Sequence, residues 1–299
     1  MSTTSSSGWL IAGLAVLGSG LPAQIPDAKK QTLVFGVYSF KRATEVSKEF
    51  EPAMLEIQRG LTQRLGHEVG IQVRIAKTYE EAQEQLVKGE VDFVRFGPAS
   101  YVLAKQQNPG IELLVAEQED GQKRCKGVFV VRRDSPIRML EDLKGKKIAF
   151  GDDKSTIGRY LSQAELAKVG LRMTDLAGHK YLDRHDKVAA AVSLGEYDAG
   201  PVHIATFESH NAKKANLRVI ASFENVGKPW IARAGLDPKV VDALRKTLLE
   251  LAVPEALEAL KVHGLQPVTD SDYQLVRLGM KKAEEFARPL DKPAPAGGK

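Results

Sequence analysis

The chain is poor in cysteine, because Cys125 is the only one among its 299 residues. An intrachain disulfide and a CxxC zinc site are therefore excluded. The apolar runs fall short of the roughly 20 residues that span a membrane, and no repeat of a solenoid is evident. Apolar residues still make up 43% of the chain. This composition is typical of a folded globular protein and argues against a disordered or fibrous one.

A strong charge of either sign is also missing. The chain has 43 basic and 38 acidic residues, which gives a net charge of +5. Short basic pairs such as Lys213-Lys214 and Lys281-Lys282 are expected on solvated helix faces. Nucleic-acid binding needs clustered Lys and Arg, so we do not expect it. The mild basic excess favours a small anionic ligand.

The N-terminal segment carries no charged side chain before Asp27. Its apolar core is Trp9–Leu17, and Ala23 offers a small residue at a possible cleavage point. This pattern is typical of a secretory signal, although the start lacks Lys and Arg and Leu21 is large for its place. We expect a signal peptide and linker over residues 1–30, cleaved near Ala23. A disordered tail and a short anchor are the alternatives.

Beyond this segment, strand-like and helix-like stretches alternate. Leu33–Ser39 is predicted to be a buried strand, and apolar residues over 50–65 recur at helical spacing. Thr78, with Glu81 three residues later, is a capping box that predicts a helix start. The same alternation continues through the middle of the chain. It predicts an α/β fold in which mostly parallel sheets are flanked by helices.

In such folds ligands bind beyond the carboxyl ends of the strands, where helix N-termini converge. The loop 151–158 (GDDKSTIG) places Ser155 and Thr156 at a helix start, where free N–H groups and the helix dipole attract an anion. Ser100 and Tyr101 lie on the first turn after a second strand–helix junction. These residues also fit plainer roles, because Ser and Thr are favoured N-caps and a Tyr can simply be packed.

Two further candidates lie at or just after the ends of predicted strands. His185 comes after the strand expected over 179–182 and could donate to an anion, although a lone His is more often structural or solvated. Tyr38 lies at the end of the first strand and is a weaker candidate. The residues by themselves therefore leave the anion site a hypothesis.

Four segments taken together resemble the phosphonate/phosphate/phosphite-binding family of periplasmic solute-binding proteins of ABC transporters. They are FGPASYV, VRRDSPIRMLEDLKGKKIAFGDDKSTIG, RHDKVAAAVSLGEYDAG and GKPWIARAGLDPKVVDALRKTLLEL. The resemblance covers about residues 32–287. It implies a two-lobed periplasmic-binding-protein-like clamp with two crossover strands and a cleft between the lobes. Lobe one would be 31–124 plus 222–290 and lobe two 125–221, with a disordered tail over 291–299.

The resemblance also implies a binding site, assembled from Ser155, Thr156 and His185 together with hydroxyls of Tyr38 and of Ser100 or Tyr101. It implies no enzyme activity, no cofactor and no metal. The expected partners are a small oxyanion and a transporter permease, and the protein is expected to be a periplasmic monomer.

Three positions depart from the family pattern. Ile157 stands where a serine is usual in the family, and Phe96 stands where some members have a tyrosine. Lys228 stands where members that hold aminoalkyl phosphonates place a carboxylate. A cation there would repel an ammonium tail, so the resemblance predicts a preference for plain oxyanions.

Cys125 leaves alternatives open. It lies at the start of the expected first crossover strand, either as a small buried apolar residue or as a soft thiolate ligand. The second role would fit an arsenite-type oxyanion sensor that signals to a membrane histidine kinase. A cysteine-dependent hydrolase with Cys125 as nucleophile and His185 as base is the least favoured alternative, because no nucleophile signature surrounds the cysteine.

Overall fold

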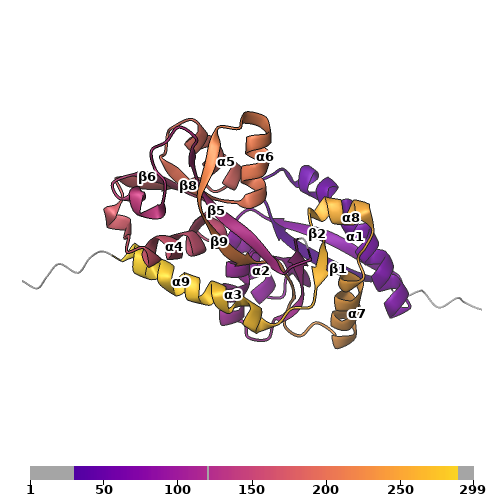
Figure 1. Ribbon diagram of the computed structural model, residues 1–299. Helices are drawn as coiled ribbons and strands as arrows, with labels where there is room; N and C mark the ends of the chain where they lie inside the picture. The colour runs from indigo at the N-terminus through magenta and orange to yellow at the C-terminus, as the bar shows by residue number, and fades with distance from the viewer. Residues whose placement is uncertain (1–29, 120, 289–299) are drawn as a thin grey trace, which may run out of the picture.

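The first lobe of the computed structural model is built on a six-stranded sheet (Figure 1). The structure describes residues 30–119 and 121–288, so the expected signal peptide and the expected tail over 291–299 lie outside the described residues. The strand order is β11-β4-β10-β3-β1-β2. The strands are β1 (Gln31–Tyr38), β2 (Val69–Ala76), β3 (Phe93–Arg95), β4 (Glu112–Gln118), β10 (Pro229–Ala232) and β11 (Gly264–Gln266). The helices are α1 (Ala43–Leu65), α2 (Tyr79–Val87), α3 (Pro98–Gln107), α7 (Pro238–Leu249) and α8 (Pro254–Leu260).

The second lobe is built on a five-stranded sheet of order β7-β6-β8-β5-β9. Its strands are β5 (Arg124–Arg132), β6 (Lys147–Phe150), β7 (Gly178–Tyr181), β8 (Ala199–His203) and β9 (Leu217–Val226). Its helical segments are η1 (Leu140–Leu143), η2 (Thr156–Leu161), α4 (Ser162–Lys168), η3 (Met173–Asp175), α5 (His185–Ser193) and α6 (Ile204–Lys214). The chain then ends its described part with η4 (Asp270–Tyr273) and α9 (Gln274–Ala287).

The α/β fold is confirmed, with sheets that are mixed. Strand β1 is parallel to β2 and β3, and β6 is parallel to β7 and β8. Strands next to a passage between the lobes run antiparallel: β10 pairs with β3 and β4, and β5 pairs with β8 and β9. Alternation of strands and helices predicts the parallel pairs, but it says nothing about a strand that returns from the other lobe.

The core of the first lobe is built around Trp230, which is fully buried. Its ring stacks on Phe35 with centroids 5.3 Å apart, and Phe93 packs against both. The apolar face of α1, from Val46 to Leu61, covers this cluster. Burying each such side chain contributes roughly 1.5–3 kcal/mol. The short strand that contains Trp230 is therefore central to the core of the first lobe, although its sequence pattern does not predict a strand there.

Local sequence sets two helix starts that matter for the cleft. The hydroxyl of Thr78 accepts from the N–H of Glu81 at 3.1 Å, so the predicted N-cap of α2 is confirmed. Ser155, which the sequence places at a helix start, is the N-cap of the helical segment over 156–168 and accepts from Gly158 N–H at 3.0 Å. That segment begins as the π-helical turn η2 before it continues as α4. Such turns are frequent at functional sites.

The two lobes are joined at three places. The chain crosses between β4 and β5 through residues 119–123 and returns between β9 and β10 through Gly227-Lys228. The two crossings run side by side, because Gly227 N–H donates to the carbonyl of Lys123 at 2.8 Å. Helix α9 is the third link: it contacts α3 and α4, and its Phe286 lies in the core of the second lobe (Figure 1).

Within residues 30–119 and 121–288, helices long and apolar enough to cross a membrane do not occur.

Candidate ligand-binding cleft

A cavity of about 410 Å³ lies between the lobes. The first lobe and the crossings line it with Tyr38, Glu49, Tyr79, Arg95, Gly97, Pro98, Glu117, Glu119, Gly227, Lys228, Ala259, Leu260, Lys261 and Val262. The second lobe lines it with Arg124, Cys125, Ser155, Thr156, Ile157, His185, His203, Ala205, Thr206 and Asn225. Five of the seven predicted site residues are therefore brought together: Tyr38, Cys125, Ser155, Thr156 and His185.

Helix N-termini converge on this cavity from both lobes. The first residue of α3, Pro98, lies on the cavity wall, as do the N-cap Ser155 of η2 and the first residue of α5, His185. The start of α6 contributes Ala205 and Thr206. The first N–H groups of a helix have no partner within it, and the helix dipole places positive potential there. The cavity is therefore suited to an anion.

Thr156 reaches across the cleft. Its side-chain oxygen, on the second lobe, accepts from the N–H of Ala99 in the first turn of α3 at 2.9 Å. Gly97 lies beside this bond: a Cβ there would be in ordinary contact with the Thr156 oxygen at 3.6 Å and in a tighter contact with the Tyr38 hydroxyl at 3.3 Å. The structure therefore holds the two lobes in contact.

Two tyrosines form one side of the cleft. The rings of Tyr38 and Tyr79 pack with centroids 4.0 Å apart, and the Tyr79 hydroxyl lies in hydrogen-bonding reach of Tyr38 and Ser155. Burial raises the pKa of both phenols above their usual value. Both hydroxyls are therefore protonated at neutral pH and can donate to an anion.

His185 faces the cleft with one ring nitrogen unsatisfied. Its Nδ1 is buried and has no hydrogen-bond partner among the described residues. Burial, together with the nearby His203 and Lys228, lowers the pKa of His185 to about 4. The ring is therefore neutral at pH 7 and carries a single N–H, for which a bound anion would compete with the carbonyl of Pro201.

The basic side chains of the cleft differ in their partners. Arg95 makes a buried ion pair with Glu117, which also accepts from the Trp230 indole N–H at 3.3 Å. Lys228 lines the same cavity, and none of the described acidic residues makes an ion pair with it. The Arg95 guanidinium and burial lower the pKa of the Lys228 ammonium. A bound anion would counter both effects, so Lys228 is the cation best placed to receive one.

Ser100 and Tyr101 are not among the cavity-lining residues. The Ser100 hydroxyl is buried with no hydrogen-bond partner among the described residues, and Tyr101 is fully buried. The Tyr101 hydroxyl donates to Asp270 at 2.5 Å, and its ring packs on Tyr273. The first turn of α3 thus presents its backbone to the cleft, while these two side chains face the body of the first lobe.

Comparison with known proteins agrees with this architecture. The model of the family described as "ABC transporter, phosphonate, periplasmic substrate-binding protein" matches residues 35–273. The chain belongs to this family.

Two curated relatives and one solved structure illustrate the similarity. A probable ABC transporter phosphite-binding protein, PhnD1 of Prochlorococcus marinus, is 31% identical over 172 residues, which cover 53% of this chain and just over half, 57%, of the relative. The phosphate-import protein PhnD of Mycolicibacterium smegmatis is 25% identical over 83% of this chain and 84% of its own. The structure of PhnD1 from Prochlorococcus marinus with methylphosphonate has a TM-score of 0.71 at 22% identity, covering 85% of this chain and 99% of that one. This last match supports the fold.

Cys125 is a nearly buried residue of this solute-binding protein. It is 9% exposed, its sulfur contacts the carbonyl of Val226 at 3.8 Å, and the Asn225 amide donates to it at 3.4 Å. Burial, with the nearby Glu119 carboxylate, raises the pKa of the thiol to about 12. The group is a thiol at neutral pH, whereas a nucleophile must be a thiolate, so its environment does not favour the hydrolase hypothesis.

Sequence reasoning missed several side chains of the binding cleft. Tyr79 is the first residue of the helix after β2, which is the same kind of junction that drew attention to Ser155 and His185. The rule that ligands bind at strand-to-helix junctions therefore applies to Tyr79 as well. Arg95, His203 and Asn225 enter through the ends of strands β3, β8 and β9, and only the assembled sheets show that they share the cavity.

Proposed function

We propose that the protein captures a small phosphorus oxyanion, such as phosphate, phosphite or a phosphonate, in the cleft and delivers it to the permease of an ABC transporter. The names of the relatives support this ligand class, since they refer to phosphite and to phosphate. Family membership supports export to the periplasm, and we infer that residues 1–30 provide the signal, with cleavage near Ala23. We also infer that the chain passes between the lobes near 124–125 and again at Gly227-Lys228, after the boundary expected at 221–222, because β9 continues to Val226 in the second sheet.

The observation that carries the proposal is the convergence of donors from both lobes on one cavity. Tyr38 and Tyr79 come from the first lobe, and Ser155, Thr156 and His185 come from the second. Ligands in a clamp of this kind favour closure because only the closed state offers both sets of contacts. The protein needs no chemical step to perform this role, and we infer that it is not an enzyme.

The strength of binding can be bounded. A hydrogen bond to a charged group contributes roughly 1.5–3 kcal/mol. Four to six such bonds, less the cost of ordering the ligand and the lobes, correspond to micromolar binding or tighter, about −8 kcal/mol. Because the donors are buried and water does not compete for them, each hydrogen bond should contribute toward the upper end of the range of roughly 1.5–3 kcal/mol.

The proposal is tested by thermal unfolding of the mature protein with phosphate, phosphite, methylphosphonate, arsenate and arsenite. We expect at least one phosphorus oxyanion to raise the midpoint in a saturable, concentration-dependent manner, as linkage requires. The double variant Thr156→Ala/His185→Ala should fold and lose that response. An unchanged midpoint across the whole panel would contradict the proposal.

The alternatives receive less support. The matched family consists of substrate-binding proteins of transporters, and the two curated relatives are named as a phosphite-binding protein of a transporter and a phosphate-import protein. These matches do not favour an arsenite-type sensor for a histidine kinase. A monomeric state remains an expectation, which the elution volume of the purified protein would check.

A further inference from the structure

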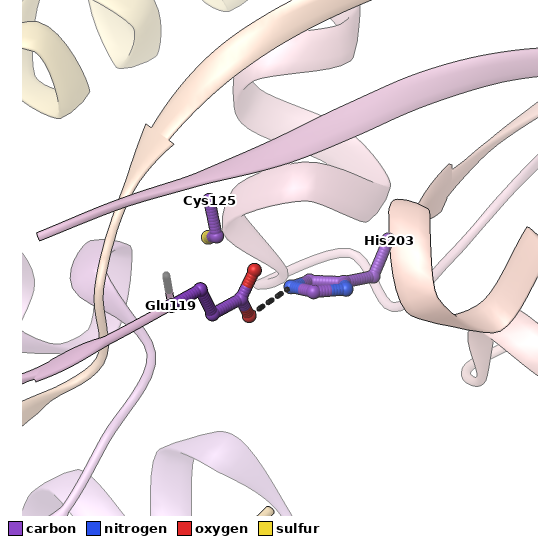
Figure 2. Close-up of side chains that lie close together, drawn as sticks. All are labelled: Glu119, Cys125 and His203. Atoms are coloured by element: carbon purple, nitrogen blue, oxygen red, sulfur yellow. Dashed lines mark ion pairs between the residues drawn. The ribbon is translucent and has the colours of Figure 1, made fainter. Parts of the chain in front are cut away.

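A second cluster of side chains lies where the first crossing between the lobes meets the cleft (Figure 2). It consists of Glu119, Cys125 and His203, and one ligand atom from each lies within 4.8 Å of the others. In Figure 2 the carboxylate of Glu119 lies between the thiol of Cys125 and the ring of His203. All three line the cavity. The anion site described above needs none of them.

Strand register explains why these residues meet. Gly127 of β5 is paired with His203 of β8, so their side-chain positions share one face of the sheet. Cys125 lies two residues before Gly127 and therefore faces the same way. Glu119 is held beside them by a local bridge, since its N–H and carbonyl both bond to Gln122 at 3.0 and 2.9 Å. The cluster is thus fixed by backbone pairing on each side.

We propose that Glu119, Cys125 and His203 bind a thiophilic divalent cation of the Zn²⁺ type. A sulfur, an imidazole nitrogen and a carboxylate oxygen are the ligand types that zinc takes in proteins. Three protein ligands would leave the fourth tetrahedral position open to a water or another ligand, and all three side chains line the cavity. On metal binding the Cys125 thiol would release its proton to solvent, and the resulting thiolate, together with the Glu119 carboxylate, would balance the two positive charges of the cation.

The geometry needs only small adjustments. The Glu119 carboxylate already lies 3.4 Å from Nε2 of His203. Ligand atoms around zinc are about 3.2–3.8 Å apart, given metal–ligand bonds of about 2.0–2.3 Å. The 4.8 Å limit of the cluster therefore leaves about 1 Å to close. His203 Nδ1 accepts from Ala205 N–H at 3.2 Å. Metal binding at Nε2 would move the ring proton to Nδ1 and end that contact.

An independent feature beside the cluster also points to a ligand. Asn225 is 4% exposed and donates its amide N–H to the sulfur of Cys125 at 3.4 Å. Its Oδ1 is buried without a hydrogen-bond partner among the described residues. A donor to a ligating sulfur is typical of the outer shell of a metal site. A water on the bound cation would give Oδ1 the partner it lacks.

Zinc binding to the purified, reduced, chelator-treated protein tests this inference, with a chromophoric chelator as competitor and no anion present. We expect one Zn²⁺ per chain. Cys125→Ser and His203→Gln should weaken binding by more than about tenfold, since even outer-shell changes have effects of that size. The control is His67→Gln, which changes a histidine outside the cleft that contacts Leu65 and Gln31, and it should leave zinc binding intact. Circular dichroism melts show which variants fold.

Cobalt gives a readout specific to the sulfur. The Co²⁺-loaded protein should show a thiolate-to-metal charge-transfer band in the near ultraviolet, and Cys125→Ser should abolish it. Zinc binding that is absent, or equal in the wild type and the folded cluster variants, would overturn the inference. The anion panel, run separately in chelator, tests the proposed function, so either hypothesis can fail without the other.

Discussion

The hydroxyl oxygen of Thr156 accepts the N–H of Ala99 across the cleft at 2.9 Å, joining the start of η2 in one lobe to the start of α3 in the other. The same side chain lines the cavity, so a ligand placed there lies against the bond that holds the lobes together. Thr156 therefore links ligand capture to closure.

Replacing this hydroxyl should weaken ligand binding. In Thr156→Ala the N–H of Ala99 loses its acceptor and the ligand loses a donor. We expect the dissociation constant for the best phosphorus oxyanion to rise about tenfold or more, since one lost hydrogen bond of about 1.4 kcal/mol has that effect. Calorimetric titration measures it. Thr156→Ser keeps the hydroxyl and should stay within about threefold of the wild type; equal losses in both variants would contradict the role of the oxygen.

Lys228 should select against ligands with a cationic tail. Its ammonium lies in the cavity, and none of the described carboxylates pairs with it. We expect methylphosphonate to bind more tightly than 2-aminoethylphosphonate. Lys228→Gln should narrow the difference between their dissociation constants, because it removes an attraction for the anionic group of methylphosphonate and a repulsion of the ammonium group of 2-aminoethylphosphonate. Competition titrations give both constants. Lys261→Gln is a matched control, because that cavity lysine is already paired with Glu49 at 3.0 Å. An aminophosphonate that binds best to the wild type would refute the prediction.

Asp152 should make stability depend on pH. Burial, with Asp153 and Glu80 nearby, raises its pKa to about 6. Because the folded pKa lies above the unfolded value, the folded state holds the extra proton between about pH 4 and 6. The free energy of unfolding should therefore fall as the pH rises through that window and stay lower above it.

Asp152→Asn should remove this cost while keeping an acceptor for the N–H of Lys154, which bonds to Asp152 Oδ1 at 2.7 Å. We expect the variant to be more stable than the wild type above pH 6 by about 1 kcal/mol, because solvent screens part of the effect at this half-exposed site. The gain should vanish near pH 4. Denaturant unfolding at several pH values checks it, and a gain independent of pH would contradict the assignment.

Gly227 should tolerate no side chain. A Cβ at this position would lie 1.9 Å from the carbonyl oxygen of Glu117 in β4, just before the first crossing begins. Gly227→Ala should lower the melting temperature by roughly 5–10 °C, which corresponds to about 2–3 kcal/mol of overpacking. Gly178→Ala is the control, because nothing lies within 4 Å of the added carbon there. Similar melting temperatures for the wild type and Gly227→Ala would show that the crossings can move apart.

Much of this architecture could be predicted from the chain alone. Periodicity and capping residues indicate β1, α1 and the start of α2 because local interactions determine them. The resemblance supplies the two-lobed clamp. The antiparallel strands β10 and β11 could not be predicted, because their short runs acquire partners only when distant segments meet.

The candidate site is likewise predictable only in part from the sequence. Ser155, Thr156 and His185 lie at the strand-to-helix junctions after β6 and β7, where the rule for ligands in α/β folds predicts a site, and all three line the cavity. Ser100 and Tyr101 satisfy the same rule, but helix rotation turns them toward the body of the first lobe, and Tyr101 there bonds to Asp270. The meeting of Glu119 and His203 depends on two chain segments more than 80 residues apart, so no local pattern could indicate it.

The most direct test of the account is calorimetric titration of the mature wild-type protein with phosphate, phosphite and methylphosphonate under identical conditions. The account predicts saturable binding of at least one of them, with one site per chain and a dissociation constant of about micromolar or below. Absence of saturable binding for all three would contradict the claim that donors from both lobes form a site for a phosphorus oxyanion.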